Sequence, residues 1–369
     1  MTTGARTGSL ATGMAIGAAL VALLLVGPVV GAAQRPAQEL PSKLTDREYW
    51  QLIEELSESN GYFQSDNLVG NERPLQNVVP ALREKKRGGV YLGVAPDQNF
   101  TYILALEPKM AFIVDIRRGN LHAHMMYKAL FELSADRAEF LSRLFSRKRP
   151  ADLGAASTPA ALFDAYFTAE PAEAIYKENL RVITDHLLKT KGFSLSGEDI
   201  QGIEYVYGMF FRYGPALTYS SSGGTGGRNM PTYADLLQAT DLEGRARSYL
   251  ATEENFRALK SFQEKNLLVP VVGDFAGPKA LRGVGKYIAD RGATVTAFYT
   301  SNVEQYLFRN GVWQGFYENV ATLPIDESST FIRSASGRNV LDPIGALVKD
   351  VREGKIVNYA QVTSRGDIR

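Results

Sequence analysis

The residues best suited to chemistry in this sequence gather around a short turn and the apolar run that follows it. Gly93 is the last glycine of the apolar run "GVYLGV", and Asp115 lies near the end of the next run, "MAFIVDI", 22 residues after Gly93. A turn of this kind brings backbone N–H groups to a ligand, and an acid about 20 residues further on accepts hydrogen bonds from ribose hydroxyls. Asp97, Gln98 and Asn99 can add polar contacts from the turn. The spacing therefore predicts a nucleoside-type cofactor site formed by Gly93, Asp97, Gln98, Asn99 and Asp115.

A second set of candidate residues follows two later apolar runs. Asp274 comes just after "NLLVPVVG", and Tyr299 and Asn302 lie at the end of "ATVTAFYTSN". Ligands of open α/β sheets bind at the carboxyl ends of the strands. We therefore predict Asp274, Tyr299 and Asn302 as the residues that orient and act on a substrate. Glu304 suits acid–base work, but the first turn of a helix capped by Ser301 or Asn302 accounts for it better.

Two further segments carry groups that bind anions. Arg117 directly follows the run that ends near Asp115, so its guanidinium suits a carboxylate or a phosphate. The loop "YSSSGGTGGRNMP" contains four glycines together with Ser222 and Arg228, which can form a backbone nest for an anion. The same composition is typical of a flexible surface loop. Aromatic residues flank the loop and favour a ligand-facing role, so we predict Arg117, Ser222 and Arg228 as substrate contacts.

Other chemistries find less support in the sequence. Cys is absent, and two of the three His residues, His122 and His124, are too close in sequence to share a helix face. No metal site is therefore predicted. A hydrolase is a weaker alternative, because no G-x-S-x-G motif supports it. The 41 Lys and Arg residues balance 40 Asp and Glu residues, so we expect a small-molecule ligand and no nucleic-acid partner.

These candidate residues need a parallel sheet to bring them together. Residues 88–116 read as strand, helix and strand, which predicts a parallel pair joined by a right-handed crossover. Residues 121–260 are mostly helical or loop-rich, after which "GFYENVATLP" and "SSTFIRSA" predict further strands. The fold class expected is α/β, with a Rossmann-like, mostly parallel sheet in a single domain, 34–369. Residues 121–260 are expected to form a helical insertion between its two halves.

The N-terminal segment differs in kind from the rest of the chain. Arg6 is the one charged residue among the first 34, and an apolar run, 14–30, leads to the small residues at 31–33. This pattern predicts a secretory signal peptide at 1–33 and hence an exported protein, periplasmic or extracellular. The run is also nearly long enough for an uncleaved membrane anchor, so this segment is the one membrane contact expected.

The turn at Gly93 and the acid at Asp115 resemble the first motif and the acidic position of class I S-adenosylmethionine-dependent methyltransferases. "PVVGDFAG", with Asp274, resembles a later strand end that lines the cofactor pocket of that family. The resemblance implies a Rossmann-like fold, S-adenosylmethionine held at its ribose by Asp115, and methyl transfer to a small molecule or protein. Ala95 and Pro96 stand where the family carries further glycines, and Pro96 removes an N–H donor from the turn.

The chain is also similar to a family of exported bacterial proteins of uncharacterised activity, which share "YLGV-PDQNFTYI", "FIVDIRR" and "TAFYTSNVEQYLF". This similarity covers most of the mature chain and implies no particular reaction. Since a fold does not fix a function, two main hypotheses follow. One is a methyltransferase, and the other is a non-catalytic extracytoplasmic protein that binds a small molecule in the same crevice. Cofactor binding separates them, because a methyltransferase requires S-adenosylmethionine.

Overall fold

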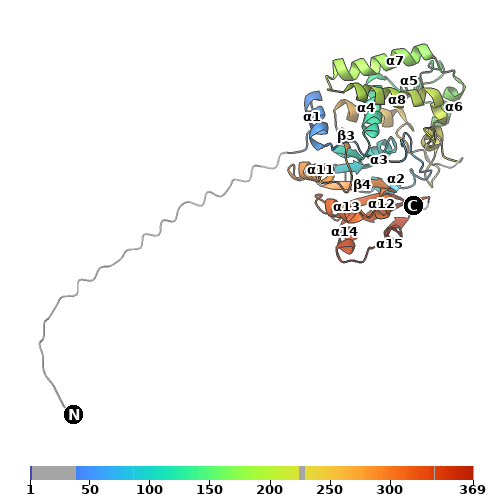
Figure 1. Cartoon of the computed structure of the whole chain (residues 1–369). Coiled ribbons are helices and arrows are strands. Elements are labelled where there is room, and N and C mark those ends of the chain that lie inside the picture. Colours follow the sequence, from blue (N-terminus) through green and yellow to red (C-terminus); the bar gives the residue numbers. More distant parts are fainter. Residues whose placement is uncertain (2–38, 86, 224–228, 336, 369) are drawn as a thin grey trace. The chain divides into compact units, whose positions relative to one another are not determined.

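The apolar runs of the sequence form a seven-stranded sheet in the computed structural model (Figure 1). The structure describes Met1 and residues 39–85, 87–223, 229–335 and 337–368. Apart from Met1, the predicted signal segment lies outside the described residues, and the chain from Ala37 onward forms a compact unit of its own. In spatial order the strands are β3 (Leu268–Val272), β2 (Met110–Asp115), β1 (Val90–Gly93), β4 (Val295–Ser301), β5 (Thr330–Ala335), β6 (Arg338–Pro343) and β7 (Asp367–Ile368).

The sheet is mixed and mostly parallel. β1 pairs in parallel with both β2 and β4, while β3 extends the sheet beyond β2 and β5 extends it beyond β4. β6 and β7 add an antiparallel edge. Every residue of β1, β2 and β3 is buried, as expected for parallel strands covered on both faces. The predicted α/β fold with a mostly parallel sheet is confirmed, and its strand order reverses between β1 and β4.

A large helical segment separates β2 from β3, as predicted. It contains α4 (Arg118–Leu133), α5 (Arg137–Phe145), α6 (Pro159–Thr168), α7 (Glu173–Asp185), α8 (Gly197–Tyr213), α9 (Tyr233–Gln238) and α10 (Glu253–Glu264). Helix α4 packs on β2 and β3 and contacts both α8 and α10. The buried guanidinium of Arg137 donates hydrogen bonds to four carbonyl groups, those of Ala155, Ser157, Leu250 and Ala251. One side chain thus ties two loops of the segment to the start of α5.

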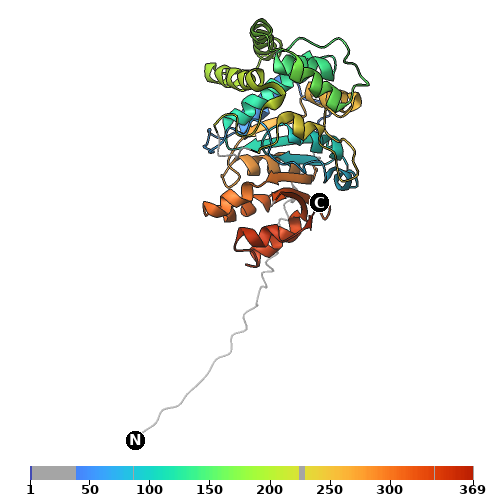
Figure 2. The same ribbon diagram turned by 90° about the vertical axis from the view of Figure 1, so that its right-hand side faces the viewer.

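The other helices precede the segment or follow β3. They are α1 (Asp46–Leu56), α2 (Val79–Arg83), α3 (Gln98–Leu106), α11 (Ala280–Ala289), α12 (Val303–Arg309), α13 (Trp313–Val320), α14 (Ile344–Arg352) and α15 (Tyr359–Thr363). Figures 1 and 2 show α12 to α15, in orange to red, at the opposite end of this unit from the green helices α5 to α8. No helix among the described residues is long and apolar enough to cross a membrane.

One of the predicted strands is a helix. "GFYENVATLP" lies largely within α13, whereas "SSTFIRSA" contains β5 as predicted. Phe316 and Val320 are fully buried and four residues apart, which is the spacing of one helix face. Because the run mixes apolar and polar residues, it fits a helix that covers the sheet better than a strand buried within it.

Candidate functional site

The carboxyl ends of the parallel strands border three neighbouring hollows. The β2–β3 cavity, of about 130 Å³, lies at the ends of those strands beside Asp115 and Gly273. The β1–β4 cavity, of about 210 Å³, lies between Ala95, after β1, and Tyr299, in β4. The β4–β6 groove, of about 670 Å³, extends past Ser334 towards β6. Together they border the edge of the sheet at which ligands of doubly wound folds bind.

Neighbouring hollows share lining residues and so form one crevice. The two cavities have in common Phe63, Asn67, Val94, Val303 and Tyr306. The β1–β4 cavity and the groove have in common Asn71, Glu72, Met230 and Asn302. The crevice therefore spans the point where the strand order reverses, and the loop that precedes α2 forms part of its wall.

Carboxyl groups and aromatic rings line the β2–β3 cavity. Asp115 ends β2, Asp274 follows β3, and both line the same cavity. The rings of Phe63 and Tyr306 pack edge to face with their centroids 4.9 Å apart, and Phe275 adds a third ring. Among the described residues, no Lys or Arg lines this cavity or the β1–β4 cavity. The lining thus combines apolar walls with acidic groups.

Asp115 is held by the residues around it, as a positioned cavity group should be. Its Oδ1 accepts a hydrogen bond of 2.9 Å from the Arg117 backbone N–H. Burial raises the pKa of Asp115, whereas the Arg117 guanidinium and the N–H groups of Arg117 and Ala95 lower it. Nε of Arg117 lies 3.8 Å from Oδ1, and its Nε and Nη2 are buried without a hydrogen-bond partner in the described part of the chain. Arg117 itself lines neither cavity, so it contributes to the site through its contacts with Asp115.

Asp274 lies in a turn that leads into α11. Its Oδ1 accepts a hydrogen bond of 2.9 Å from the N–H of Ala276, and no described residue bonds to its Oδ2. The carboxylate of Glu58 accepts the backbone N–H groups of Asp274, Lys279 and Ala280. Since Glu58 already occupies the start of α11, that helix terminus is not free to bind a phosphate.

Glu72 is the central polar group where the β1–β4 cavity meets the groove. It is only 4% exposed. Its Oε1 accepts hydrogen bonds from the hydroxyls of Tyr299 (2.6 Å) and Ser301 (2.5 Å), and its Oε2 accepts a longer one from Asn339 (3.5 Å). Burial raises the pKa of Glu72, and these three hydrogen bonds lower it in part. No ion pair offsets the burial of this carboxyl group within the described residues, which is typical of a functional acid.

Gln98 connects the turn after β1 to this group. Its Nε2 donates to the hydroxyl of Tyr299, which in turn donates to Glu72. The Oε1 of Gln98 is buried and has no hydrogen-bond partner among the described residues, although the side chain lines the β1–β4 cavity. A buried acceptor of this kind calls for a donor from a ligand or an ordered water.

Two other residues of the predicted cofactor site support the turn itself. Asn99 is fully buried, and its Nδ2 donates to the carbonyl groups of Val94, Ala95 and Pro96. A Cβ at Gly93 would lie 2.0 Å from Asn99 Oδ1, so packing against Asn99 requires glycine there. Neither Gly93 nor Asn99 lines the two cavities.

Asp97 is also buried, on the side of the helical segment. It accepts a hydrogen bond of 3.2 Å from the hydroxyl of Tyr249. Burial raises the pKa of Asp97 to about 7, although the bond from Tyr249 lowers it. Of the five predicted cofactor residues, Gln98 and Asp115 therefore line cavities, whereas Gly93, Asp97 and Asn99 lie behind their walls.

The sequence matches the family described as Domain of unknown function (DUF7790) over residues 68–364. The chain belongs to this family. The matched range includes Glu72, Asp115 and Asp274 and every strand except β7. No curated protein matches the sequence.

The residues predicted to act on a substrate are divided between the hollows of this DUF7790 chain. Tyr299 and Asn302 line the β1–β4 cavity, whereas Asp274 lines the β2–β3 cavity. Of the predicted substrate contacts, Arg117 lies beside Asp115, and Ser222 lies next to Tyr205. Arg228 lies outside the described residues, so its prediction has no structural counterpart here.

From the sequence, Asn71 and Glu72 are expected only as part of a polar loop that could close over the site, and turn chemistry explains that loop equally well. The sequence does not indicate Glu72 as the central acid. Glu72 follows Asn71 in a polar, turn-rich loop, and its spacing relates it to no other acid. Glu304, in contrast, lies in a fully buried ion pair with Arg333 and accepts the hydroxyl of Tyr317. The structural interpretation of Glu304, at the start of α12, therefore fits better than an acid–base role.

All three histidines have hydrogen-bond partners within the protein, and none of them lines the crevice. His122 contacts Asp199, His124 contacts the carbonyl of Ala95, and His186 contacts Glu132. Burial lowers the pKa of His124 to about 4. No cluster of potential metal ligands occurs among the described residues.

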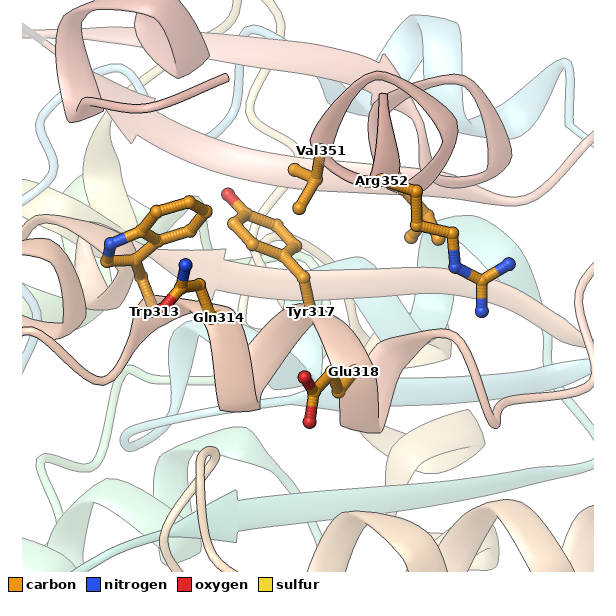
Figure 3. A pocket seen from close by; sticks show the side chains of 7 residues that line it. Trp313, Gln314, Tyr317, Glu318, Val351 and Arg352 are labelled. Carbon is orange, nitrogen blue, oxygen red and sulfur yellow. The ribbon is translucent and has the colours of Figure 1, made fainter. Parts of the chain in front are cut away.

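A separate hollow, of about 430 Å³, lies between α13 and α14 (Figure 3). Trp313 and Tyr317 line it from α13, and Val351 and Arg352 line it from α14. The hydroxyl of Tyr317 is already bonded to Glu304, so this group is committed to the fold. The hollow shares no lining residue with the crevice.

Proposed function

We propose that the crevice binds S-adenosylmethionine and that the protein is a methyltransferase. The observation that carries this proposal is the acidic lining of the two cavities. Asp115, Asp274 and Glu72 contribute three carboxyl groups, and no Lys or Arg lines either cavity in the described part of the chain. Such a lining favours a ligand that is cationic and rich in hydrogen-bond donors. S-adenosylmethionine carries a sulfonium, an ammonium group and a ribose, and it has no phosphate.

A phosphate-bearing nucleotide fits the same crevice less well. Phosphates are usually bound by free N–H groups at a helix N-terminus. The turn before α3 contains Pro96, which has no N–H, and the buried carboxyl of Asp97. The N–H groups at the start of α11 already bond to Glu58. The chain therefore offers a phosphate few donors and several negative charges.

The atoms without protein partners indicate how the cofactor would be held. Asp115 would accept the ribose hydroxyls, and the free Oδ2 of Asp274 would accept an amine hydrogen of the adenine. The edge-to-face pair of Phe63 and Tyr306 would present one apolar surface for the base to pack against. Arg117 lies behind this lining, with its Nε 3.8 Å from Asp115, and would act on the cofactor through that carboxyl group.

The neighbouring cavity supplies groups for the acceptor molecule. S-adenosylmethionine would provide an electrophilic methyl group. Glu72, held by Tyr299 and Ser301, would accept a proton from the acceptor, because it is a buried carboxyl group where two hollows meet. Gln98 and Asn302 would orient that molecule, since both line the same cavity.

Calorimetric titration of S-adenosylmethionine and S-adenosylhomocysteine tests the proposal. We expect micromolar binding to the protein and a loss of at least about tenfold in Asp115→Asn and in Asp274→Asn, or about 1.4 kcal/mol each. Asp152→Asn is the matched control, because Asp152 is exposed and lies outside the crevice. The absence of binding at millimolar ligand would rule out the methyltransferase proposal.

A non-catalytic binding protein is the second candidate. It is favoured by the turn after β1, where Ala95 adopts a φ of 67°, a conformation usually left to glycine. Its methyl group narrows the β1–β4 cavity that it lines. An extracytoplasmic location, which the N-terminal segment predicts, also suits a binding role. If S-adenosylmethionine does not bind in the titration above and another small molecule does bind in the crevice, this candidate is favoured.

A further inference from the structure

The β4–β6 groove carries its own set of polar side chains. With about 670 Å³ it is the largest of the three hollows, and its size is in the range of pockets that hold small molecules. We infer that this groove binds a neutral, polyhydroxylated molecule such as a sugar. One hydroxyl of this molecule donates a hydrogen bond to the carboxylate of Glu72. The inference does not depend on S-adenosylmethionine, and it applies to a methyltransferase and to a binding protein alike.

Side-chain amides and hydroxyls dominate the groove. Asn71, Asn302 and Gln305 line it, and their amide groups make no hydrogen bond with the described residues. The hydroxyl of Ser334 is likewise without a described partner. An amide offers both donors and acceptors, and a sugar hydroxyl is both donor and acceptor, so the two match in kind.

The charge of the groove favours a neutral ligand. Arg73 is the one cationic residue that lines it among the described residues, and its guanidinium donates to the carbonyl of Asn229 at 3.0 Å. The guanidinium of Arg333, the residue before Ser334, does not line the groove and is paired with Glu304 and Asp342. A phosphate or carboxylate would therefore meet a single cation and the acid Glu72.

Glu72 is the hydrogen-bond acceptor at the inner end of the groove. Among the described residues, its Oε2 accepts only the long contact from Asn339, at 3.5 Å. This oxygen therefore has unused capacity to accept a hydrogen bond, and a ligand hydroxyl can supply the donor. The buried Oε1 of Gln98, also without a described partner, lies in the adjoining β1–β4 cavity.

The outer wall adds an aromatic surface. Tyr359, on α15, is half-buried and lines the groove, with its ring 6.2 Å from that of Phe308. A tyrosine ring that is apolar on its face and polar at its tip suits the mixed surface of a sugar. The groove thus combines amides, acceptors and a ring around one volume.

Saturation-transfer NMR with glucose, N-acetylglucosamine and sucrose at millimolar concentration tests the inference. We expect transfer to at least one of these sugars. We expect the double variant Gln305→Ala with Ser334→Ala to bind that sugar at least about tenfold more weakly, because both residues line the groove and neither of the two cavities. Gln314→Ala removes an amide from the separate α13–α14 hollow and should leave sugar binding unchanged.

The outcomes separate this inference from the cofactor proposal. Sugar binding without any binding of S-adenosylhomocysteine would support the groove and overturn the cofactor. The absence of transfer from all three sugars, or equal transfer in the double variant, would overturn the groove. Stronger binding of glucose 6-phosphate than of glucose would also overturn it, because the ligand would then be anionic. The double variant should bind S-adenosylhomocysteine as the wild type does.

Discussion

At the residue scale, burial is the largest influence on the acids near the crevice, and only at Asp115 does a cation, Arg117, partly offset it. Burial raises the pKa values of Glu72, Asp97 and Asp115. Glu132 shows the contrast: burial acts on it too, but hydrogen bonds and charges from His186 and two Lys residues lower its pKa to about 2. The acids near the crevice therefore take up protons more readily than an ordinary surface acid.

Asp97 makes a testable contribution to the pH dependence of stability. The folded protein holds its proton up to about pH 7, whereas the unfolded chain releases it near the ordinary pKa of 3.8. Between those values the folded state binds more protons, so the free energy of unfolding falls as pH rises, by on the order of 4 kcal/mol. Asp97→Asn removes this titration and should be more stable than the wild type above neutral pH.

Urea unfolding at several pH values measures this effect. The wild type should lose stability between about pH 4 and about pH 7, the two pKa values of Asp97 in the unfolded and the folded state, and Asp97→Asn should lose clearly less. Asp152→Asn, an exposed acid, should follow the wild type. Parallel curves for Asp97→Asn and the wild type would contradict the role given to this burial.

At the element scale, a buried ion cluster fastens α12 to the antiparallel edge of the sheet. Arg333 of β5 pairs with Glu304 of α12 and, at 2.9 Å, with Asp342 of β6. All three side chains are almost completely buried, and the Tyr317 hydroxyl of α13 also donates to Glu304. Asn302 lies between β4 and α12 along the chain. By holding α12 in place, this cluster therefore also positions Asn302 in the crevice.

Glu304→Ala should be strongly destabilising. It leaves the buried guanidinium of Arg333 with one partner instead of two, a change that typically costs about 3–5 kcal/mol. Urea unfolding measures the loss, and Glu353→Ala is the control, because Glu353 pairs with Lys349 and Lys355 at the surface and should leave the midpoint unchanged. Equal midpoints for Glu304→Ala and the wild type would show that the cluster is not needed for stability.

At the scale of the whole molecule, the positions of the charges matter more than their sum. The chain as a whole is nearly neutral, with a formal net charge of +1. The two cavities nevertheless concentrate carboxyl groups, and no cation lines them within the described residues. A balanced composition therefore conceals cavities with an acidic lining, on which the proposed choice of ligand rests.

Thermal unfolding with different ligands tests this charge distribution. S-adenosylhomocysteine at about 100 times its dissociation constant should stabilise the protein by about 2.7 kcal/mol. ATP and NAD⁺ at the same concentration should leave the transition unchanged, because their phosphates meet carboxylates and occupied helix termini. A shift with ATP equal to that with S-adenosylhomocysteine would contradict the proposed choice of ligand.

The fold could be predicted because its strands are locally encoded. Short apolar runs such as 88–94 and 110–116 are buried on both faces, and that burial pattern is visible in the sequence itself. The error at 315–324 arose because a half-buried helix over a sheet and a short strand share similar composition. Strand order and the position of the switch point depended on pairing between distant segments, which no local pattern records.

The sequence by itself determined the α/β class, the helical segment between β2 and β3, and the acids that end β2 and follow β3. Only the tertiary structure decided which side chains share a cavity. From the sequence, Asp97, Gln98 and Asn99 were equally plausible ligand contacts. At the start of α3, however, the side chains of Asp97 and Asn99 are buried behind the cavity wall, whereas Gln98 lines the cavity. Glu72 meets Tyr299 across 227 residues of sequence. Such a contact is set by how distant segments pack, so local spacing could not reveal it.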